Sequence, residues 1–312
     1  MKNKVICIVG ATASGKTSLS IELAKKINAE IISADSMQIY KKLDIATAKV
    51  TKEEMEGIPH HMIDICDVDE KFSVAEFKNM CYDEIDKIFK KGKNVIIVGG
   101  TGLYINSIVY DMQFEDENSN DELRNMLYKE AKEKGNEYVY EKLKSIDEEA
   151  ATEIHPNNVK RVIRAIEMAQ KSDKLKSSYL LEEKERLSKF VHPKYEFFVY
   201  CIDYPREKLY QRINKRVDIM IKQGLLNEAK MVYDMRLDSN CTCMQSIGYK
   251  EFFEYFEGKI SLDDAIDNLK KATRHYAKRQ MTWFNNKLEC IKLTDYDNTQ
   301  KMIDKIITTS NI

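Results

Sequence analysis

The stretch GATASGKT, residues 10–17, decides the fold of the first part of the chain. It matches the phosphate-binding pattern G-x-x-x-x-G-K-[ST], in which the last glycine, the lysine and the threonine have fixed places. The loop residues are Gly10, Ala11, Thr12, Ala13, Ser14, Gly15, Lys16 and Thr17. KVICIVG just before them predicts a buried strand, and SLSIELAKKI just after them repeats apolar residues at helical spacing. Because this arrangement points backbone N–H groups at a phosphate chain, the sequence predicts a polyphosphate site.

The composition is that of a globular protein with more than one part. The chain has 312 residues, of which 43% are hydrophobic and 32% charged. This length predicts a core with an insertion or an appendage. No apolar run approaches the length of a membrane span, and a signal-peptide cleavage region is lacking. The seven scattered cysteines favour free thiols in a reducing compartment, so we expect a cytoplasmic protein without a structural metal. We also expect a monomer.

The charge is balanced overall but uneven along the chain. A formal net charge of −1 argues against a wholly basic nucleic-acid binder. Residues 111–153 are rich in acids, whereas HPNNVKRVIRAIEMAQK (155–171) and NLKKATRHYAKRQMTWFNNK (268–287) are basic. Such blocks permit a local site for a polyanion. Solvated helix faces are the alternative explanation for each block taken alone.

Strand and helix patterns alternate over the first hundred residues. VICIVG, EIISAD, HMIDIC and NVIIVGG are short apolar runs separated by helical patterns, which predicts an α/β fold with a parallel sheet. After Tyr110 the chain becomes polar and helical, EFFVYCIDY (196–204) predicts a return to the sheet, and LECIKLT (288–294) predicts a last strand. We therefore expect a phosphate-loop core over residues 1–112, a helical insertion over 113–192, and a return to the core with a helical C-terminal region over 193–312.

Polar residues follow the predicted strands at the edge where ligands of open α/β sheets bind. Asp35 and Ser36 follow EIIS, and Gly99-Gly100-Thr101-Gly102 follows NVIIV. The Asp35 carboxylate could coordinate a metal through water or act as a general base, and an N-cap is the alternative. Thr101 could donate a hydrogen bond to a ligand, and a tight turn is the alternative for its loop.

Two later stretches add cations. Arg212 and Arg216 are four residues apart and share one helix face, where they could grip diphosphate oxygens or pair with Glu207 or Asp218. KKATRHYAKRQMTWF mixes basic and aromatic residues, a composition that suits an RNA surface. On spacing alone Trp283 and Phe284 belong to the core. His60 and His61 are adjacent and cannot both face one ion from a regular element, so we interpret them as structural.

Nine motifs together resemble a known family. GATASGKT, ISADSMQIY, DIATAK, PHHMIDI, VGGTGLYI, HPNNVKRVIRAIE, MIKQGLLNE, SIGYKE and AKRQMTWF recur in this order in the bacterial tRNA dimethylallyltransferases, also called tRNA isopentenyltransferases. The resemblance spans Gly10 to about Phe284. Three departures stand out: Ala11 replaces a usual proline, Lys160-Arg161 replaces Gln-Arg, and the C-terminal zinc finger of eukaryotic relatives is missing.

The resemblance implies transfer of a dimethylallyl group from dimethylallyl diphosphate to the exocyclic amine of the adenosine 3′ of the anticodon. The phosphate loop would then hold a prenyl diphosphate, with Mg²⁺ at Thr17. Lys16, Thr101 and Arg216 would stabilise the departing diphosphate, and Asp35 would accept the proton of the amine. The adenine would have to leave its stack to reach them.

The resemblance also implies a tRNA-binding surface around the anticodon loop. Its members are Asp35, Ser36, Met37, Gln38, Thr101, Arg124, Lys160, Arg161, Val162, Ile163, Arg164, Gln245, Gly248, Tyr249, Arg274, Lys278, Arg279 and Gln280.

Three other functions share part of this pattern. A P-loop kinase of a small molecule or nucleotide would use the same loop to bind ATP, although the chain lacks a compact arginine-rich lid and the basic tail would have no task. A prenyltransferase of free adenine nucleotides would share the chemistry and differ in the acceptor. A nonenzymatic RNA-binding protein is disfavoured because Lys16, Thr17, Asp35 and Thr101 are all present.

Overall fold

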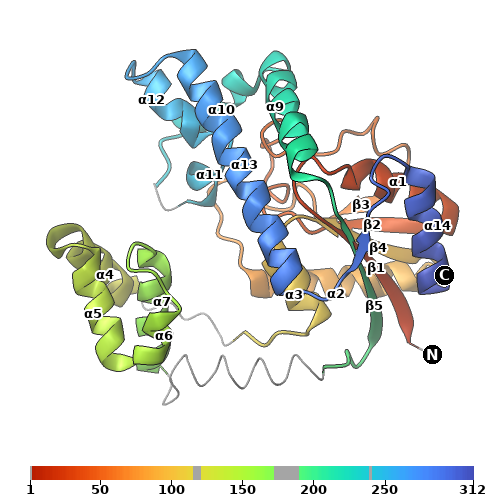
Figure 1. The fold of residues 1–312 in the computed structure, drawn as a ribbon, viewed down its shortest axis with the longest axis horizontal. Coiled ribbons are helices and arrows are strands. Elements are labelled where there is room, and N and C mark those ends of the chain that lie inside the picture. Colours follow the sequence, from red (N-terminus) through yellow and green to blue (C-terminus); the bar gives the residue numbers. More distant parts are fainter. Residues whose placement is uncertain (1, 115–120, 172–189, 239–240) are drawn as a thin grey trace. The chain divides into compact units, whose positions relative to one another are not determined.

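The chain separates into two compact units. The computed structural model describes residues 2–114, 121–171, 190–238 and 241–312 (Figure 1). Unit 1 comprises Met1–Met112 together with His192–Ile312, and unit 2 comprises Gln113–Val191. Residues 115–120, which belong to the stretch expected to be helical, lie outside the described residues.

Unit 1 is built on a parallel sheet, which confirms the predicted α/β class. Its strands are β1 (Asn3–Val9), β2 (Ala29–Ser33), β3 (His60–His61), β4 (Asn94–Gly99), β5 (Tyr195–Ile202) and β6 (Ile291–Leu293). They lie in the order β3-β2-β4-β1-β5-β6, and every paired neighbour runs parallel. The central strand β1 pairs with β4 on one side and with β5 on the other, from Asn3↔Tyr195 to Val9↔Cys201.

Alternating side chains of β1 enter two separate cores. Ile6 and Ile8 pack with α1 (Lys16–Ile27), α14 (Thr299–Ser310) and the start of α9 (Arg206–Lys222). Val5, Cys7 and Val9 pack on the other face, with α2 (Val74–Lys90), α3 (Gly102–Val109) and the end of α13 (Leu262–Asn286). The sheet is therefore covered on both faces, as a parallel sheet requires.

The third apolar run is shorter as a strand than the sequence predicts. HMIDIC (61–66) suggested a full strand, but β3 contains only His60 and His61. The reason is the backbone, because Met62 and Asp64 have φ angles of 62° and 55°, in the left-handed region. Extended pairing is impossible there, and an isolated bridge between Tyr40 and Cys66 follows instead.

Beyond the sheet, unit 1 carries a helical subregion with its own core. Its elements are α10 (Leu225–Asp234), α11 (Thr242–Gln245), the 3₁₀ turn η1 (Lys250–Phe252), α12 (Phe253–Phe256) and most of α13. The largest buried side chains are Tyr249, Phe252 and Tyr40. A capping box at Ser261 and Asp264 fixes the start of α13, which runs from this subregion to the sheet.

The described residues of unit 2 form four helices: α4 (Asp121–Lys134), α5 (Asn136–Ile146), α6 (Glu148–Thr152) and α7 (Val159–Lys171). Its core includes Leu127, Val139 and Leu143, with Val162 and Ile166 from α7. Within the described ranges of both units, every helix falls short of the length and apolar character that crossing a lipid bilayer requires.

A buried carboxylate ties together the edge of the sheet. Glu30 on β2 is 2% exposed and accepts from His61 Nε2 at 2.8 Å, with Lys91 Nζ at 2.9 Å and Lys93 Nζ at 3.2 Å. Burial alone would raise the pKa of this carboxyl. The hydrogen bonds from Lys91, His61 and Lys93 outweigh burial and lower the pKa from 4.5 to about 2.

We expect Glu30→Gln to destabilise unit 1 in a pH-dependent way. The depressed pKa corresponds to about 3 kcal/mol of folding free energy, fully present above pH 4.5 and lost as pH falls toward 2. Denaturant unfolding from pH 7 to pH 3 should therefore show a gap between wild type and variant that closes below pH 4.5. The control is Glu196→Gln, an exposed glutamate on β5. A gap that is constant with pH would contradict the assignment.

Candidate active site at the carboxyl ends of the strands

The phosphate loop joins β1 to α1, as the sequence predicts. Gly10 and Gly15 have φ angles of 150° and 97°, and Gly15 forms the N-cap of α1. At Gly10 a side chain would also crowd Ser14 Oγ at 3.1 Å and the carbonyl of Ile202 at 3.4 Å. Glycine is therefore required at both ends of the loop. The loop opens toward the N-terminus of α1, where backbone N–H groups attract anions.

Lys16 folds back over this loop. Its Nζ donates to the carbonyl oxygens of Gly10 at 3.0 Å and Ala11 at 2.8 Å. Burial lowers the pKa of this lysine from 10.5 to about 8, with a further lowering from Arg216 and an opposing effect from Asp35. Burial makes the charged form of this ammonium group less stable, so a negatively charged phosphate that binds beside it would stabilise that charge strongly.

A pocket of about 640 Å³ lies in front of the loop. Arg212 and Arg216 line it from α9, together with Lys16, so the predicted shared helix face meets the phosphate loop. Arg212 Nε donates to the carbonyl of Ala13 at 2.8 Å, and Asp218 pairs with Lys270. Burial lowers the pKa of Arg216, while Asp35 opposes this shift. The remaining lining residues are Ala13, Gly15, Thr17, Ser18, Ile21, Glu22, Ala48, Glu54, Glu56, Lys215 and Ile219.

Asp35 lies on the segment that follows β2, within electrostatic reach of both Lys16 and Arg216. One carboxylate oxygen accepts from the backbone N–H of Met37 at 2.9 Å. The residues that follow form a turn and not a helix, so this contact stabilises the turn and is not a helix N-cap. Gln38, three residues after Asp35, has its amide held between Ser33 Oγ at 3.1 Å and the carbonyls of Thr47 and Ala48.

The GGTG segment after β4 lies against the same strand ends. Thr101 Oγ1 accepts from the backbone N–H of Ser36 at 3.1 Å and lies 3.3 Å from Ser36 Oγ. A methyl group on Gly99 would lie 2.1 Å from the carbonyl oxygen of Ala34, so this position excludes every side chain. The turn and the hydroxyl predicted here are therefore both present, and Thr101 lies beside the Asp35 segment.

Gln280 on α13 connects two of these loops. Thr12 N–H donates to its Oε1 at 2.8 Å, and its Nε2 donates to the carbonyl of Gly100 at 3.0 Å. Its side chain is 5% exposed. The resemblance had suggested an RNA contact for Gln280, and this interpretation needs correction because both ends of its amide bind the protein backbone.

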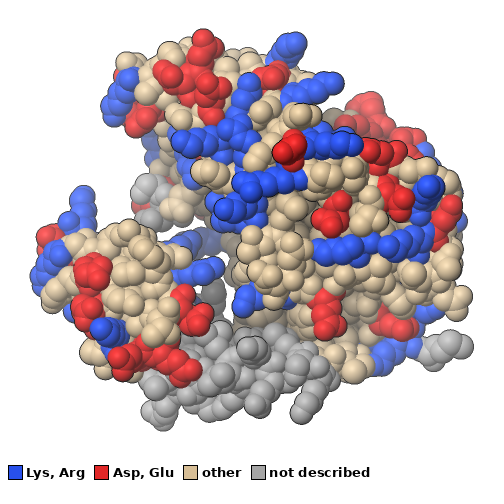
Figure 2. All heavy atoms as spheres, in the orientation of Figure 1, with Lys and Arg blue, Asp and Glu red and all other residues tan. Residues whose placement is uncertain are grey.

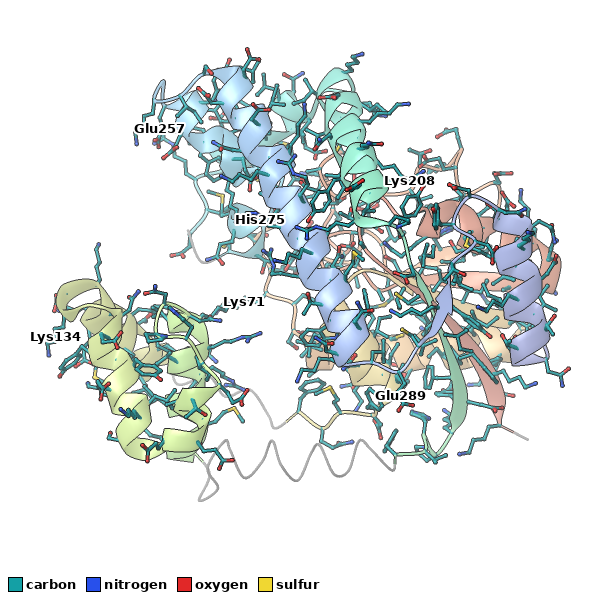
Figure 3. All side chains as sticks on the ribbon, in the orientation of Figure 1. Lys71, Lys134, Lys208, Glu257, His275 and Glu289 are labelled. Atoms are coloured by element: carbon teal, nitrogen blue, oxygen red, sulfur yellow. The ribbon has the colours of Figure 1, made fainter. Side chains whose placement is uncertain are left out.

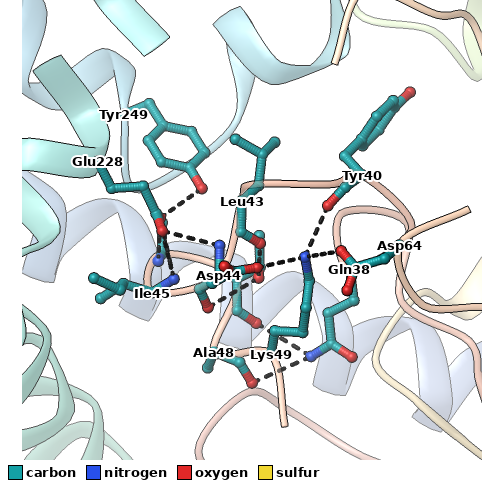
Figure 4. A network of polar contacts seen from close by, with 12 residues as sticks. Gln38, Tyr40, Leu43, Asp44, Ile45, Ala48, Lys49, Asp64, Glu228 and Tyr249 are labelled. Atoms are coloured by element: carbon teal, nitrogen blue, oxygen red, sulfur yellow. Dashed lines mark hydrogen bonds and ion pairs between the residues drawn. The ribbon is translucent and has the colours of Figure 1, made fainter. Parts of the chain in front are cut away.

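The segment after Gln38 is fixed by two charged residues that the sequence analysis did not select (Figure 4). Glu228 on α10 accepts from three consecutive backbone N–H groups at 44–46 and from Tyr249 Oη at 2.9 Å. Lys49, with a nearly buried side chain, pairs with Asp44 at 2.7 Å and Asp64 at 2.6 Å. Glu228 ends the motif MIKQGLLNE and Lys49 ends the motif DIATAK. Membership of these motifs was the only sequence feature that could have pointed to the two residues.

The basic stretch of α13 presents cations on its surface. Lys278 and Arg279 are exposed, and Arg274 is half-buried with its guanidinium donating to Asn214 at 2.6 Å. Lys and Arg side chains gather along the course of α13 in Figure 2, and His275 projects from its middle in Figure 3. Trp283 and Phe284 pack in the core of the sheet, as their spacing suggested.

Several other candidates for RNA contact are buried. Val162 and Ile163 belong to the core of unit 2, and Tyr249 is fully enclosed with its hydroxyl bonded to Glu228. Gly248 faces Ala46, because an added methyl group would lie 2.5 Å from the Ala46 Cβ. These side chains support the elements that carry their exposed neighbours Lys160, Arg161 and Gln245, and they do not themselves offer a surface.

Two of the candidate arginines in unit 2 already have a partner. Glu167 on α7 is fully buried, with Arg124 Nε at 2.8 Å and Arg164 Nη1 at 3.0 Å. Burial raises the pKa of this carboxyl, and the two arginines more than reverse the effect. Arg124 joins α4 to Glu167 on α7, whereas Arg164 pairs with Glu167 within α7 itself. Both arginines are partly exposed, so each can bind Glu167 and still present a positive edge.

Comparison with known proteins gives a consistent result. Residues 38–287 match the family described as IPP transferase. A tRNA dimethylallyltransferase of Acetivibrio thermocellus is 50% identical, over 97% of this chain and 96% of that protein. The tRNA dimethylallyltransferase of Bacillus subtilis is 48% identical, over 92% of this chain and 90% of that protein.

Solved structures agree. A tRNA isopentenylpyrophosphate transferase from Staphylococcus epidermidis superposes with a TM-score of 0.72 at 48% identity, over 99% of both chains. A eukaryotic dimethylallyltransferase acting on tRNA superposes with a TM-score of 0.79 at 32% identity, over 99% of this chain and 79% of that one. The family match over most of the chain, the near-full-length identity and the shared fold lead to one conclusion: this chain belongs to the IPP transferase family.

Proposed function

We propose that the protein transfers a dimethylallyl group from dimethylallyl diphosphate to the exocyclic amine of the adenosine 3′ of the anticodon in tRNA. The names of its relatives support the donor group and the acceptor class. The observation that carries the proposal is one pocket that combines a phosphate loop with Lys16 and Arg216, with Asp35 within electrostatic reach of both cations.

The chemical difficulty is the weak nucleophile. The lone pair of an adenine amine is delocalised into the ring, so the allylic carbon must become strongly electrophilic as diphosphate departs. Negative charge then builds on the leaving oxygens, where the loop N–H groups, Lys16 and Arg216 act. Loss of one such preorganised donor costs on the order of 10²–10³ in rate. Thr101 would add a hydroxyl from the neighbouring loop.

Asp35 is the proposed general base. Its backbone position after β2 and its attraction to Lys16 and Arg216 support this role. There it would accept a hydrogen bond from the amine and then its proton, a contribution of roughly 10²–10⁴ in rate.

A magnesium ion fits the donor set. Thr17 lines the pocket, and the described residues contain no group of three His, Cys, Asp or Glu that could hold a metal by themselves. The Thr17 hydroxyl would therefore hold Mg²⁺ together with oxygens of the substrate and water, which is the set that this ion prefers. Bound there, the ion would neutralise charge on the diphosphate.

The proposed tRNA surface combines exposed side chains with partly exposed ones. In unit 1 it includes Gln245, Arg274, Lys278 and Arg279, with Ser36, Met37 and Gln38 nearest the base. In unit 2 it includes Lys160, Arg161, Arg164 and Arg124. Cations of this kind contact phosphates, so they set affinity and register, and the pocket residues select the base.

Transfer of labels from two donors tests the function. The protein with Mg²⁺ receives prenyl-labelled dimethylallyl diphosphate or γ-labelled ATP, with unmodified tRNA or adenosine monophosphate as acceptor. We expect prenyl label in tRNA alone. Prenyl label in the mononucleotide would change the acceptor, and phosphate transfer without prenyl transfer would make the protein a kinase.

In the same assay, Asp35→Asn should lower turnover roughly 10²–10⁴-fold while tRNA affinity stays within a few-fold. Asp67→Asn, a surface carboxylate paired with Lys41, is the matched control and should keep normal turnover. Near-normal turnover of Asp35→Asn would exclude this residue as the base.

The affinity for dimethylallyl diphosphate should fall above about pH 8. Below that pH Lys16 is charged and binds phosphate, and above it the free lysine loses its proton. Calorimetry from pH 6.5 to 9.5 should show a dissociation constant that rises at first by roughly tenfold per pH unit above the pKa. Lys16→Arg should bind more weakly with a flatter profile, because arginine stays protonated. An unchanged profile in that variant would assign the titration to another group.

Neutralising Lys278 and Arg279 should weaken tRNA binding and flatten its salt dependence. Loss of two phosphate contacts lowers the slope of log K against log salt by roughly 1.4–1.8. Fluorescence anisotropy with labelled tRNA between 0.05 and 0.3 M salt measures this slope for Lys278→Gln/Arg279→Gln. The charge-matched control is Lys301→Gln/Lys305→Gln on α14, which packs on α1. Equal slopes in the two double variants would exclude the α13 cations from the tRNA surface.

A further inference from the structure

One buried side chain near the site takes no part in the chemistry described above, yet it contacts both the phosphate loop and the GGTG segment. Gln280 lies in the C-terminal half of α13, directly after Lys278 and Arg279, which face solvent. Its own side chain turns inward and is buried. The helix therefore has two functional faces at this level, one toward solvent and one toward the strand ends.

The contacts of Gln280 fit the two groups of a primary amide. Its oxygen accepts from Thr12 N–H at 2.8 Å, in the middle of the phosphate loop. Its nitrogen donates to the Gly100 carbonyl at 3.0 Å, in the GGTG segment. A carboxylate would lack the donor, and a lysine or arginine would lack the acceptor. An apolar side chain would leave a buried N–H and a buried C=O without these partners.

The fit is close on the GGTG side. A methyl group on Gly100 would lie 2.2 Å from Gln280 Nε2, so only glycine allows the amide to reach this backbone. The hydroxyl of Tyr276, one helical turn earlier, lies near the side chains of Thr101 and Gln280. Thr101 in turn accepts from Ser36 N–H, next to Asp35. The chain of contacts thus runs from the phosphate loop through α13 to the segment that carries the proposed base.

We infer that Gln280 is a positioning residue that sets the spacing between the phosphate loop and the Thr101 loop, and thereby the geometry of the diphosphate site. The inference rests on the proposed function for its effect on turnover, but its effect on diphosphate binding stands independently. Gln280 acts through the backbone of Thr12 and Gly100 and touches no reacting atom. A misplacement of about 1 Å in such a site can cost roughly 10²-fold in rate.

The experiment compares two variants of Gln280. Gln280→Met keeps length and volume and removes both hydrogen bonds. Gln280→Glu keeps the acceptor for Thr12 and sets a carboxylate against the Gly100 carbonyl, a clash that protonation relieves because a carboxylic acid can donate. Calorimetry with inorganic diphosphate and Mg²⁺, tRNA anisotropy and prenyl transfer are measured on the full chain. Thr282→Ala is the neutral control, since its exposed hydroxyl donates to the helix carbonyl of Lys278.

We expect Gln280→Met to weaken diphosphate binding at least tenfold and to lower prenyl transfer roughly 10²-fold, with tRNA affinity within twofold of wild type. Lys278→Gln should show the reverse pattern, with weaker tRNA binding and normal diphosphate binding. For Gln280→Glu, diphosphate binding relative to wild type should recover as pH falls from 8 to 5.5.

Other outcomes overturn the inference. Weaker tRNA binding with normal diphosphate binding would make Gln280 an RNA contact, and normal values for both would make it a dispensable core residue. If Gln280→Met does not fold, a Gln280→Glu variant without recovery at low pH refutes the role. If no protein of the set transfers a prenyl group while the diphosphate results hold, the proposed function fails and the positioning role stands.

Discussion

The structure depends on the pairing of one strand. β1 is hydrogen-bonded on both sides, to β4 and to β5, in parallel register. Parallel pairing brings the carboxyl ends of the strands to one edge, so the phosphate loop, the Asp35 segment and the GGTG segment have to meet there. Their closeness then requires glycine, since a methyl group on Gly99 would lie 2.1 Å from the Ala34 carbonyl oxygen.

At this edge of the sheet, two partly buried cations lie within electrostatic reach of one carboxylate. Burial lowers the pKa of both Lys16 and Arg216, and the negative charge of Asp35 opposes the shift in each case. The charges of the two cations are therefore incompletely compensated, which favours an incoming diphosphate. Under the proposed function, this one arrangement would serve both the leaving group and the nucleophile.

The parts that sequence could predict are those written in local patterns. The phosphate loop, the strand ends at Asp35 and Thr101, and the shared face of Arg212 and Arg216 each follow from a few neighbouring residues. The early end of β3 could not be predicted, because the left-handed backbone at Met62 and Asp64 leaves no mark on an apolar run.

Side-chain partners far apart in the chain were equally invisible. A glutamine within a basic, aromatic helix looks the same whether it faces RNA or the backbone of Thr12. Arg124 likewise has the positive charge expected of an RNA contact, and only the fold shows that it pairs with Glu167 on another helix. Burial separates the residues that resemblance groups together, as Val162 and its exposed neighbour Arg161 illustrate.

The insertion of unit 2 between β4 and β5 has a consequence for synthesis on the ribosome. The first four strands are complete before unit 2 emerges, yet the long edge of β1 pairs with β5, which follows it. An apolar strand edge therefore stays open for the time needed to translate unit 2, and such edges invite pairing with other chains. Because unit 2 has its own core, it can fold during this interval. The length of the insertion therefore sets how long this one edge of β1 waits for its partner strand.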